Sequence, residues 1–346
     1  MDMPRHRARV AKGIRSLNAA AQLRKLVDEV HLDPLLTETD RFRKRVDLLE
    51  RFDAFDLNSR LQNECATDSE VQLCRRAFAL RSKLEAANLE MYECIRETIR
   101  RGHGRDALLR WAAEIETEVP SDRYARNRDT SNRDTSNRSA SNLDASNRDT
   151  SNLGTSLRSA GESYDYLDEL VSGVLGFAKP CEPEIELSAE MVPYQPTPAR
   201  HVFDLLDRLR LTAKDVFVDL GSGLGHVALL VAICTDAGTV GIELEPSYVE
   251  CARRSTEQLN LANAKFLMQD AREADLSSGS VFYLYTPFRG AILRTVLDRL
   301  QLEAKTRMVR VCTFGPCTPM VAAEPWLTID AGEASHVSVF RSRFQL

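Results

Sequence analysis

The sequence predicts an all-α N-terminal region followed by an α/β domain with a mostly parallel sheet, and three observations support this. Over residues 5–118, apolar residues recur at intervals of three and four, which is the spacing of one face of a helix. Beyond Pro198, short apolar runs alternate with helical patterns, as parallel strands joined by crossover helices do. The last two runs are separated only by residues 330–335. Because this link is too short for a crossover helix, one of the two strands must run antiparallel.

Seven apolar runs are the candidate strands of this domain. They are Val216–Leu220, Thr239–Ile242, Lys265–Met268, Val281–Tyr285, Met308–Thr313, Trp326–Ile329 and Val337–Phe340. Helical patterns lie between most of them, for example Ser247–Leu261 and Gly290–Leu300. An earlier helix is expected to begin at Pro198, with Thr197 as its N-cap, because proline suits a first helical position and threonine a cap.

Three parts are expected along the chain. Residues 1–120 form a helical domain whose apolar stripes are typical of a bundle core, with docking of a protein partner as the alternative role. Residues 121–162 form a low-complexity, disordered insertion. Its five-residue units, such as Arg128-Asp-Thr-Ser-Asn132, mostly lack the apolar residue that a folded solenoid needs in its interior. Residues 163–346 form the α/β domain.

Composition argues against several classes of protein. Lys and Arg number 46 against 51 Asp and Glu, so no overall positive field favours nucleic acid. The eight cysteines include no C-x-x-C pair and no histidine at zinc-ligand spacing, and we expect reduced thiols and no metal. No apolar run approaches the roughly 18 residues of a membrane span, and the N-terminus lacks the apolar core of a secretory signal. We therefore expect a cytoplasmic protein with no membrane partner.

The strongest local signal is a glycine-rich turn after the first strand of the α/β domain. Asp219 lies near the end of the run Val216–Leu220. Gly221, Gly223 and Gly225 follow, and a helix is expected from about His226. Glycines let a backbone approach a ligand closely, and this turn falls at the carboxyl edge of the sheet. The spacing G-x-G-x-G differs from the dinucleotide fingerprint G-x-G-x-x-G, which disfavours a nicotinamide-dependent dehydrogenase.

Two further acids follow the next two strands. Glu243 ends the second, where a carboxylate can accept hydrogen bonds from both hydroxyls of a ribose. Asp270 follows the third, where a carboxylate can accept from an exocyclic adenine amine. One acid after each of three consecutive strands indicates a nucleoside site.

These motifs resemble the cofactor motifs of the class I S-adenosylmethionine-dependent methyltransferases, and the terminal hairpin resembles that superfamily's antiparallel seventh strand. The resemblance implies a Rossmann-like seven-stranded methyltransferase sheet and S-adenosyl-L-methionine as cofactor. Within the superfamily, residues 215–232 (DVFVDLGSGLGHVALLVA) resemble the histone-lysine methyltransferases of the disruptor-of-telomeric-silencing family. That likeness implies methylation of a lysine Nε.

The resemblance also implies that residues after the fourth strand face the transferred methyl group, which would give catalytic roles to Tyr285, Thr286 and Phe288. Amino methyltransferases of nucleobases or glutamine amides carry Asp or Asn, then Pro-Pro and an aromatic. This chain matches that pattern at Pro287 and Phe288 and departs from it at Tyr285 and Thr286. We therefore expect methyl transfer to a nitrogen or oxygen acceptor, a protein lysine or a small molecule. The alternatives are a nucleic-acid amino methyltransferase and a non-catalytic cofactor-binding interaction protein.

Three neighbouring features have expected roles at the same site. Tyr194 can close over the site as a lid. His226 is expected either to hydrogen-bond the cofactor carboxylate or to face solvent at the helix start. The segment Cys312–Cys317, at the end of the fifth strand, can form one wall of the acceptor site.

Overall fold

The computed structural model describes residues 19–55, 57, 67–117, 165–177, 184–330 and 336–343. The basic N-terminus, the five-residue repeats, the whole insertion predicted at 121–162 and the link 331–335 lie outside the described residues. The chain divides into two compact units. The described residues up to 93 and from 112 to 117 belong to the first, and residues 94–111 and those from 165 onward belong to the second.

The first unit consists of helices, as its apolar periodicity predicts. Its elements are a helix at 19–32, the 3-10 turns η1 (Pro34–Thr37) and η2 (Thr39–Arg41), α2 (Phe42–Asp53), and parts of α4 (Asp68–Arg100) and α5 (Gly104–Thr117). Leu26, Leu48 and Phe52 belong to its core. The fully buried Arg45 donates from Nε to Asn88 at 2.6 Å, so a polar network braces the helices from inside.

The boundary between the units does not fall at residue 120. The last turns of α4, from Cys94, belong to the second unit together with the start of α5. Arg96 donates to the carbonyl of Val174 at 2.8 Å, and Arg100 donates to that of Gln258 at the same distance. These bonds tie the end of α4 to the second unit, although the helical sequence pattern continues without a break.

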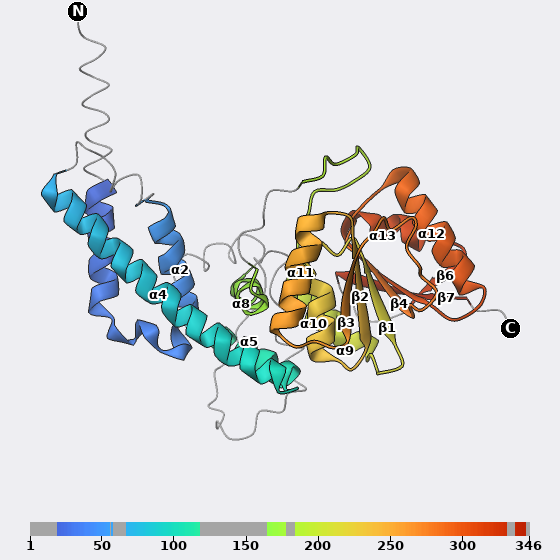
Figure 1. Cartoon of the computed structure of the whole chain (residues 1–346), viewed down its shortest axis with the longest axis horizontal. Coiled ribbons are helices and arrows are strands. Elements are labelled where there is room, and N and C mark those ends of the chain that lie inside the picture. Colours follow the sequence, from blue (N-terminus) through green and yellow to red (C-terminus); the bar gives the residue numbers. More distant parts are fainter. Residues whose placement is uncertain are drawn as a thin grey trace, which may run out of the picture. The chain divides into compact units, whose positions relative to one another are not determined.

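The second unit is built on a seven-stranded sheet in the order β3-β2-β1-β4-β5-β7-β6 (Figure 1). The strands are β1 (Val216–Leu220), β2 (Gly238–Glu243), β3 (Ala264–Met268), β4 (Val281–Leu284), β5 (Arg310–Phe314), β6 (Leu327–Ile329) and β7 (Val337–Ser342). Only β7 is antiparallel to its neighbours, β5 and β6. The predicted α/β class, the seven strands and the antiparallel partner within the terminal pair are confirmed.

Helices cover both faces of this sheet (Figure 1). They are α8 (Tyr166–Leu175), α9 (Ala199–Leu209), α10 (His226–Cys234), α11 (Pro246–Gln258), α12 (Gly290–Ala304) and α13 (Thr318–Ala322), with the 3-10 turn η4 (Gly315–Cys317). One face packs α12 against Val218, Phe282 and Val311 in a continuous apolar core. Within the described ranges, no helix is long and apolar enough to cross a bilayer.

The cap expected for α9 is wrong. The helix begins at Ala199, and its first N–H donates to Asp168 of α8 at 2.7 Å. The Thr197 hydroxyl instead shares a 2.8 Å hydrogen bond with the buried Tyr283 of β4. Thr197 is itself buried against the sheet, so its side chain does not face the helix end.

Candidate functional site

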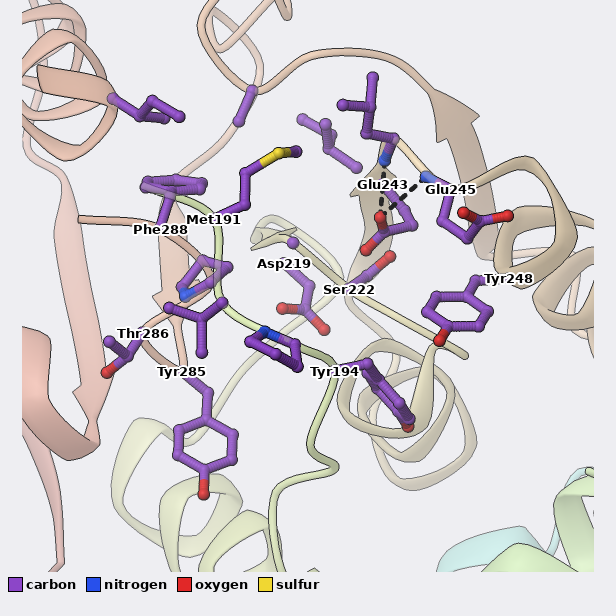
Figure 2. Close-up of a pocket in the computed structure, with 18 of the residues that line it drawn as sticks. Met191, Tyr194, Asp219, Ser222, Glu243, Glu245, Tyr248, Tyr285, Thr286 and Phe288 are labelled. Atoms are coloured by element: carbon purple, nitrogen blue, oxygen red, sulfur yellow. Dashed lines mark hydrogen bonds between the residues drawn. The ribbon is translucent and has the colours of Figure 1, made fainter. Parts of the chain in front are cut away.

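A cavity of about 800 Å³ opens at the carboxyl edge of the sheet, where the ends of β1, β2, β3 and β4 meet. Residues 184–198, here called the strap, form its other wall together with the loop after β4 (Figure 2). The volume is in the range typical of small-molecule sites. Of the residues predicted from sequence, those lining the cavity are Tyr194, Asp219, Gly221, His226, Glu243, Asp270, Tyr285, Thr286 and Phe288.

Two acids that the sequence reasoning did not single out fix the strap, one at its start and one near its middle. Glu245 accepts from the backbone N–H groups of Glu184 and Ile185, both at 3.0 Å. Glu190 accepts from Ala291 and Ile292 at 2.9 and 3.1 Å, so its carboxylate caps the start of α12. Pro246 at the first turn of α11 was the one available signal, since it marks Glu245 as a helix cap.

The middle of the strap pairs with the loop that follows β4. Met191 forms an antiparallel bridge with Phe288, and Val192 donates to the carbonyl of Pro287 at 3.1 Å. This loop carries the residues that were expected to face the acceptor. The strap therefore closes the cavity over the end of β4.

The glycine loop bends through three left-handed glycines, Gly221 (φ 81°), Gly223 (φ 54°) and Gly225 (φ 88°). A Cβ on Gly221 would lie 2.2 Å from Pro287, and one on Gly223 would lie 2.0 Å from the ring of Tyr194. The faces left bare by these two glycines are thus covered by the β4 loop and the strap. Gly221 also lines the cavity, and the expected contact of this loop with a ligand stays a prediction.

Glu243 is held rigidly beside this loop. Its Oε2 accepts from the N–H of Gly223 at 2.8 Å, and its Oε1 accepts from Leu244 and Glu245 at 2.7 and 3.0 Å (Figure 2). A carboxylate offers about four acceptor positions. One position on Oε2 therefore stays open for a hydroxyl of a ligand without displacing any backbone bond.

Asp270 already has a charged neighbour. Its two oxygens receive Arg272 in a fork, with Nη2 at 2.7 Å from Oδ2 and Nε at 3.0 Å from Oδ1. This guanidinium holds the pKa of Asp270 below its usual range. Asp270 is consequently an ionised acceptor, and a ligand amine would donate to the same carboxylate as Arg272 does.

Asp219 differs because it is 3% exposed. Burial, with a smaller contribution from the nearby charge of Glu243, raises the pKa of Asp219 to about 8. On the same loop, the hydroxyl of Ser222 is buried and has no hydrogen-bond partner among the described residues. A cation bound here would favour ionisation of Asp219, and the unsatisfied hydroxyl of Ser222 suits a ligand that also carries polar groups.

The three residues after β4 have different surroundings. Thr286 stands at φ 41°, donates its hydroxyl to the carbonyl of Phe314 at 3.2 Å and accepts from the N–H of Cys317 at 3.0 Å. Both bonds join the β4 loop to the end of β5. Tyr285 packs at 4.6 Å from the ring of Phe314, and Phe288 is 6% exposed within the apolar core.

His226 does not face solvent, which was one of its two expected roles, but it does line the cavity. Its Nδ1 lies 2.7 Å from the hydroxyl of Tyr194 and its Nε2 lies 3.3 Å from that of Ser172, so both ring nitrogens have protein partners. The residue is 9% exposed, and burial lowers the pKa of His226 to about 3. The imidazole is therefore neutral and shielded from solvent, and its expected hydrogen bond to the cofactor carboxylate stays a prediction.

The predicted acceptor wall at the end of β5 is smaller than expected. Of Cys312–Cys317, Pro316 alone lines the cavity, while Cys312 and Cys317 are fully buried. Across the described ranges, no three His, Cys, Asp or Glu side chains are grouped so that they could hold a metal ion.

Comparison with known proteins places this site in context. A family model described as histone methylation protein DOT1 matches residues 191–283, which include the strap from Met191, the glycine loop and β4. No curated protein matches the chain.

Solved structures that resemble the chain include three methyltransferases. An RNA methyltransferase from Salinibacter ruber, in complex with S-adenosyl-L-homocysteine, is 27% identical over 43% of this chain and 92% of its own, with a TM-score of 0.35. A precorrin-6y C5,15-methyltransferase from Geobacter metallireducens is 15% identical over 45% and 93%, with a TM-score of 0.36. A tRNA (uracil-54, C5)-methyltransferase from Pyrococcus abyssi, in complex with S-adenosyl-L-homocysteine, is 20% identical over 43% and 39%, with a TM-score of 0.34.

The class of the protein follows from the family match and the sheet, and does not depend on these three structures. The sheet order with one antiparallel strand next to its edge, the acids after three consecutive strands and the histone-methylation model agree with one another. The chain belongs to the class I S-adenosylmethionine-dependent methyltransferases. S-adenosyl-L-methionine is its cofactor.

Proposed function

We infer that the cavity binds S-adenosylmethionine along β1–β3 and that the methyl group is transferred to an aliphatic amine, a protein lysine or a small molecule. The observation that carries this proposal is the charge of the cavity. Its acidic lining residues are Glu190, Asp219, Glu243, Glu245 and Asp270, whereas Arg272 is its one Lys or Arg among the described residues. Because Arg272 is paired with Asp270, no cation is left to receive a phosphate.

The residues present fit the cofactor. Glu243 has an acceptor position for a ribose hydroxyl, and Asp270 is an ionised acceptor for an amine. Glu243 lies close to the buried Asp219, whose carboxyl keeps its proton below about pH 8 in the cofactor-free chain and ionises more readily when a cation binds beside it. The cofactor supplies a methyl group on a positively charged sulfonium, which is already activated for in-line displacement.

The chain contributes mainly by holding the acceptor close and aligned, which is where most of the acceleration arises for such a reaction. An alkylammonium is attracted to an acidic cavity and must lose its proton before its nitrogen lone pair can attack. The nitrogen–carbon bond forms as the carbon–sulfur bond breaks, and the proton leaves for solvent. A nucleic-acid backbone would be repelled by the same acids.

The test is incubation of cell extract with the purified protein and S-adenosylmethionine labelled in its methyl group. We expect label that protease or small-molecule extraction removes and that nuclease leaves in place. The Glu243→Ala variant, added at equal concentration, gives the background. Label released by nuclease would favour the nucleic-acid alternative, and label no higher than that background would favour a non-catalytic cofactor-binding protein.

A further inference from the structure

The side chain of Tyr194 anchors the strap to the glycine loop. The Tyr194 ring covers the bare face of Gly223, where even a Cβ would be only 2.0 Å away. Its other neighbour is Tyr248 of α11, with ring centroids 5.2 Å apart, and Figure 2 shows the two tyrosines side by side at the rim of the cavity. This contact joins the strap to α11 and to the glycine loop, whose Gly223 N–H donates to Glu243.

The hydroxyl of Tyr194 is fixed from behind by His226. The 2.7 Å bond from Nδ1 is continued by the 3.3 Å contact between Nε2 and Ser172 of α8, and the ring of Phe177 packs 4.4 Å from the imidazole. Because burial lowers the pKa of His226 to about 3, the imidazole stays neutral at any pH at which the protein functions. The direction of this hydrogen-bonded chain therefore does not change with pH in that range.

The cavity exists while this contact is made. Its 800 Å³ volume, with Asp219, Glu243 and Asp270 in its wall, is present with the Tyr194–His226 bond closed. A contact that is the same with and without a ligand contributes nothing to the ligand's affinity, because only a difference between two states shifts an equilibrium. It can nevertheless slow the passage of a ligand in both directions.

We propose that His226 is a positioning residue that latches Tyr194, and with it the strap, onto the glycine loop, and that opening this latch sets how fast the cofactor enters and leaves. This rests on the proposed binding of S-adenosylmethionine along β1–β3. The latch acts on access to the pocket and leaves the cofactor contacts unchanged. Tyr194 and His226 therefore control rates, while the strand-end acids control affinity.

Tyr194→Phe is the central test, because it removes one oxygen atom and keeps the ring on Gly223. Association and chase-induced dissociation of tritiated S-adenosylmethionine are measured by rapid mixing. Loss of one hydrogen bond is expected to raise both rate constants by about fivefold, with Kd changed by less than about twofold. His226→Gln, which keeps an acceptor for the tyrosine hydroxyl, should stay near the wild-type rates, whereas His226→Leu should match Tyr194→Phe.

Tyr92→Phe, on α4 in the first unit, is the matched control and should change neither rate. Melting temperatures of all variants are compared, so that a loss of folding is seen directly. Unchanged rates in Tyr194→Phe would overturn the latch. A higher Kd with an unchanged association rate would also overturn it, since the hydroxyl would then contact the cofactor itself. If the wild-type chain bound no S-adenosylmethionine, the proposed function would fail before the latch was tested.

Discussion

The two halves of the sheet's carboxyl edge differ in what their side chains are free to do. After β1, β2 and β3 stand acids whose oxygens retain acceptor capacity or charge for a ligand. After β4 and β5, the side chains bond to neighbouring loops of the chain. Thr286 is an example, because its hydroxyl makes two hydrogen bonds to backbone groups. The half formed by β1, β2 and β3 therefore keeps hydrogen-bond acceptors for a ligand. The other half is shaped to hold its own loops, and the acceptor must use what those loops leave exposed.

The largest effect is expected at Glu243. Glu243→Ala removes the ribose acceptor and releases three backbone N–H groups, including that of Gly223 in the glycine loop. Calorimetry should show affinity for S-adenosylmethionine falling by about 100-fold, or about 2.7 kcal/mol. Glu250→Ala, exposed on α11, is the control and should bind as the wild type does. If both variants bound S-adenosylmethionine equally well, Glu243 would not be a cofactor-binding residue.

Gly223→Ala tests whether strap and loop depend on each other. The added Cβ meets both a left-handed φ and the Tyr194 ring, so denaturant unfolding should show a loss of about 2–3 kcal/mol. Gly102→Ala, with φ 83° and open space around it, isolates the backbone strain and should cost about 1 kcal/mol. Gly238→Ala, which has neither problem, should be near neutral. Equal losses at Gly223 and Gly102 would show that the strap does not press on the loop.

The pH dependence of binding follows from Asp219. A cation prefers the ionised carboxylate, so cofactor affinity should rise by up to about tenfold per pH unit toward pH 8 and level off above it. Unfolding has the opposite trend, because the folded carboxyl keeps its proton from about pH 4 to about pH 8 and the unfolded one does not. Stability of the cofactor-free chain should therefore fall as pH rises across this window. Asp219→Asn should abolish both trends, and thermal unfolding and calorimetry from pH 5 to 9 will decide.

The smallest effect is expected from Tyr285→Phe in the other half of the edge. Tyr285 is half-buried beside Phe314 and far less enclosed than Asp219. Its hydroxyl is predicted to orient the acceptor, so removing it should raise the acceptor KM by about threefold while Kd for the cofactor stays constant. A change in cofactor affinity instead would mean that the two halves are not separate. Steady-state kinetics against each substrate distinguish the outcomes once the acceptor is known.

The fold was predictable because periodicity reports burial directly. All seven strands were placed within a few residues, and the short link between β6 and β7 required an antiparallel partner. The end of α4 was not predictable, since its apolar stripe continues unchanged from one unit into the other. An apolar stripe indicates which face of a helix is buried, but it does not indicate which part of the protein packs against that face.

The site was only partly predictable for a related reason. Acids after consecutive strands converge because parallel strands end at one edge, so Asp219, Glu243 and Asp270 could be grouped from sequence. Glu190 and Glu245 act through backbone contacts with segments far along the chain, and no local pattern marks such partners. The burial of His226 could not be predicted because it depends on α8 and the strap, which meet it only in the folded domain.

The position of β7 in the sheet constrains the order in which the strands of the domain can pair during folding. In the sheet order, β6 pairs with β7 alone, and β7 lies between β6 and β5. During synthesis β6 emerges first and has no strand to join, while β5 presents an open edge. The sheet can close only when β7 inserts between β5 and β6, both of which precede it in the chain. A stalled or shortened chain would thus expose an unpaired β5, a surface that invites aggregation.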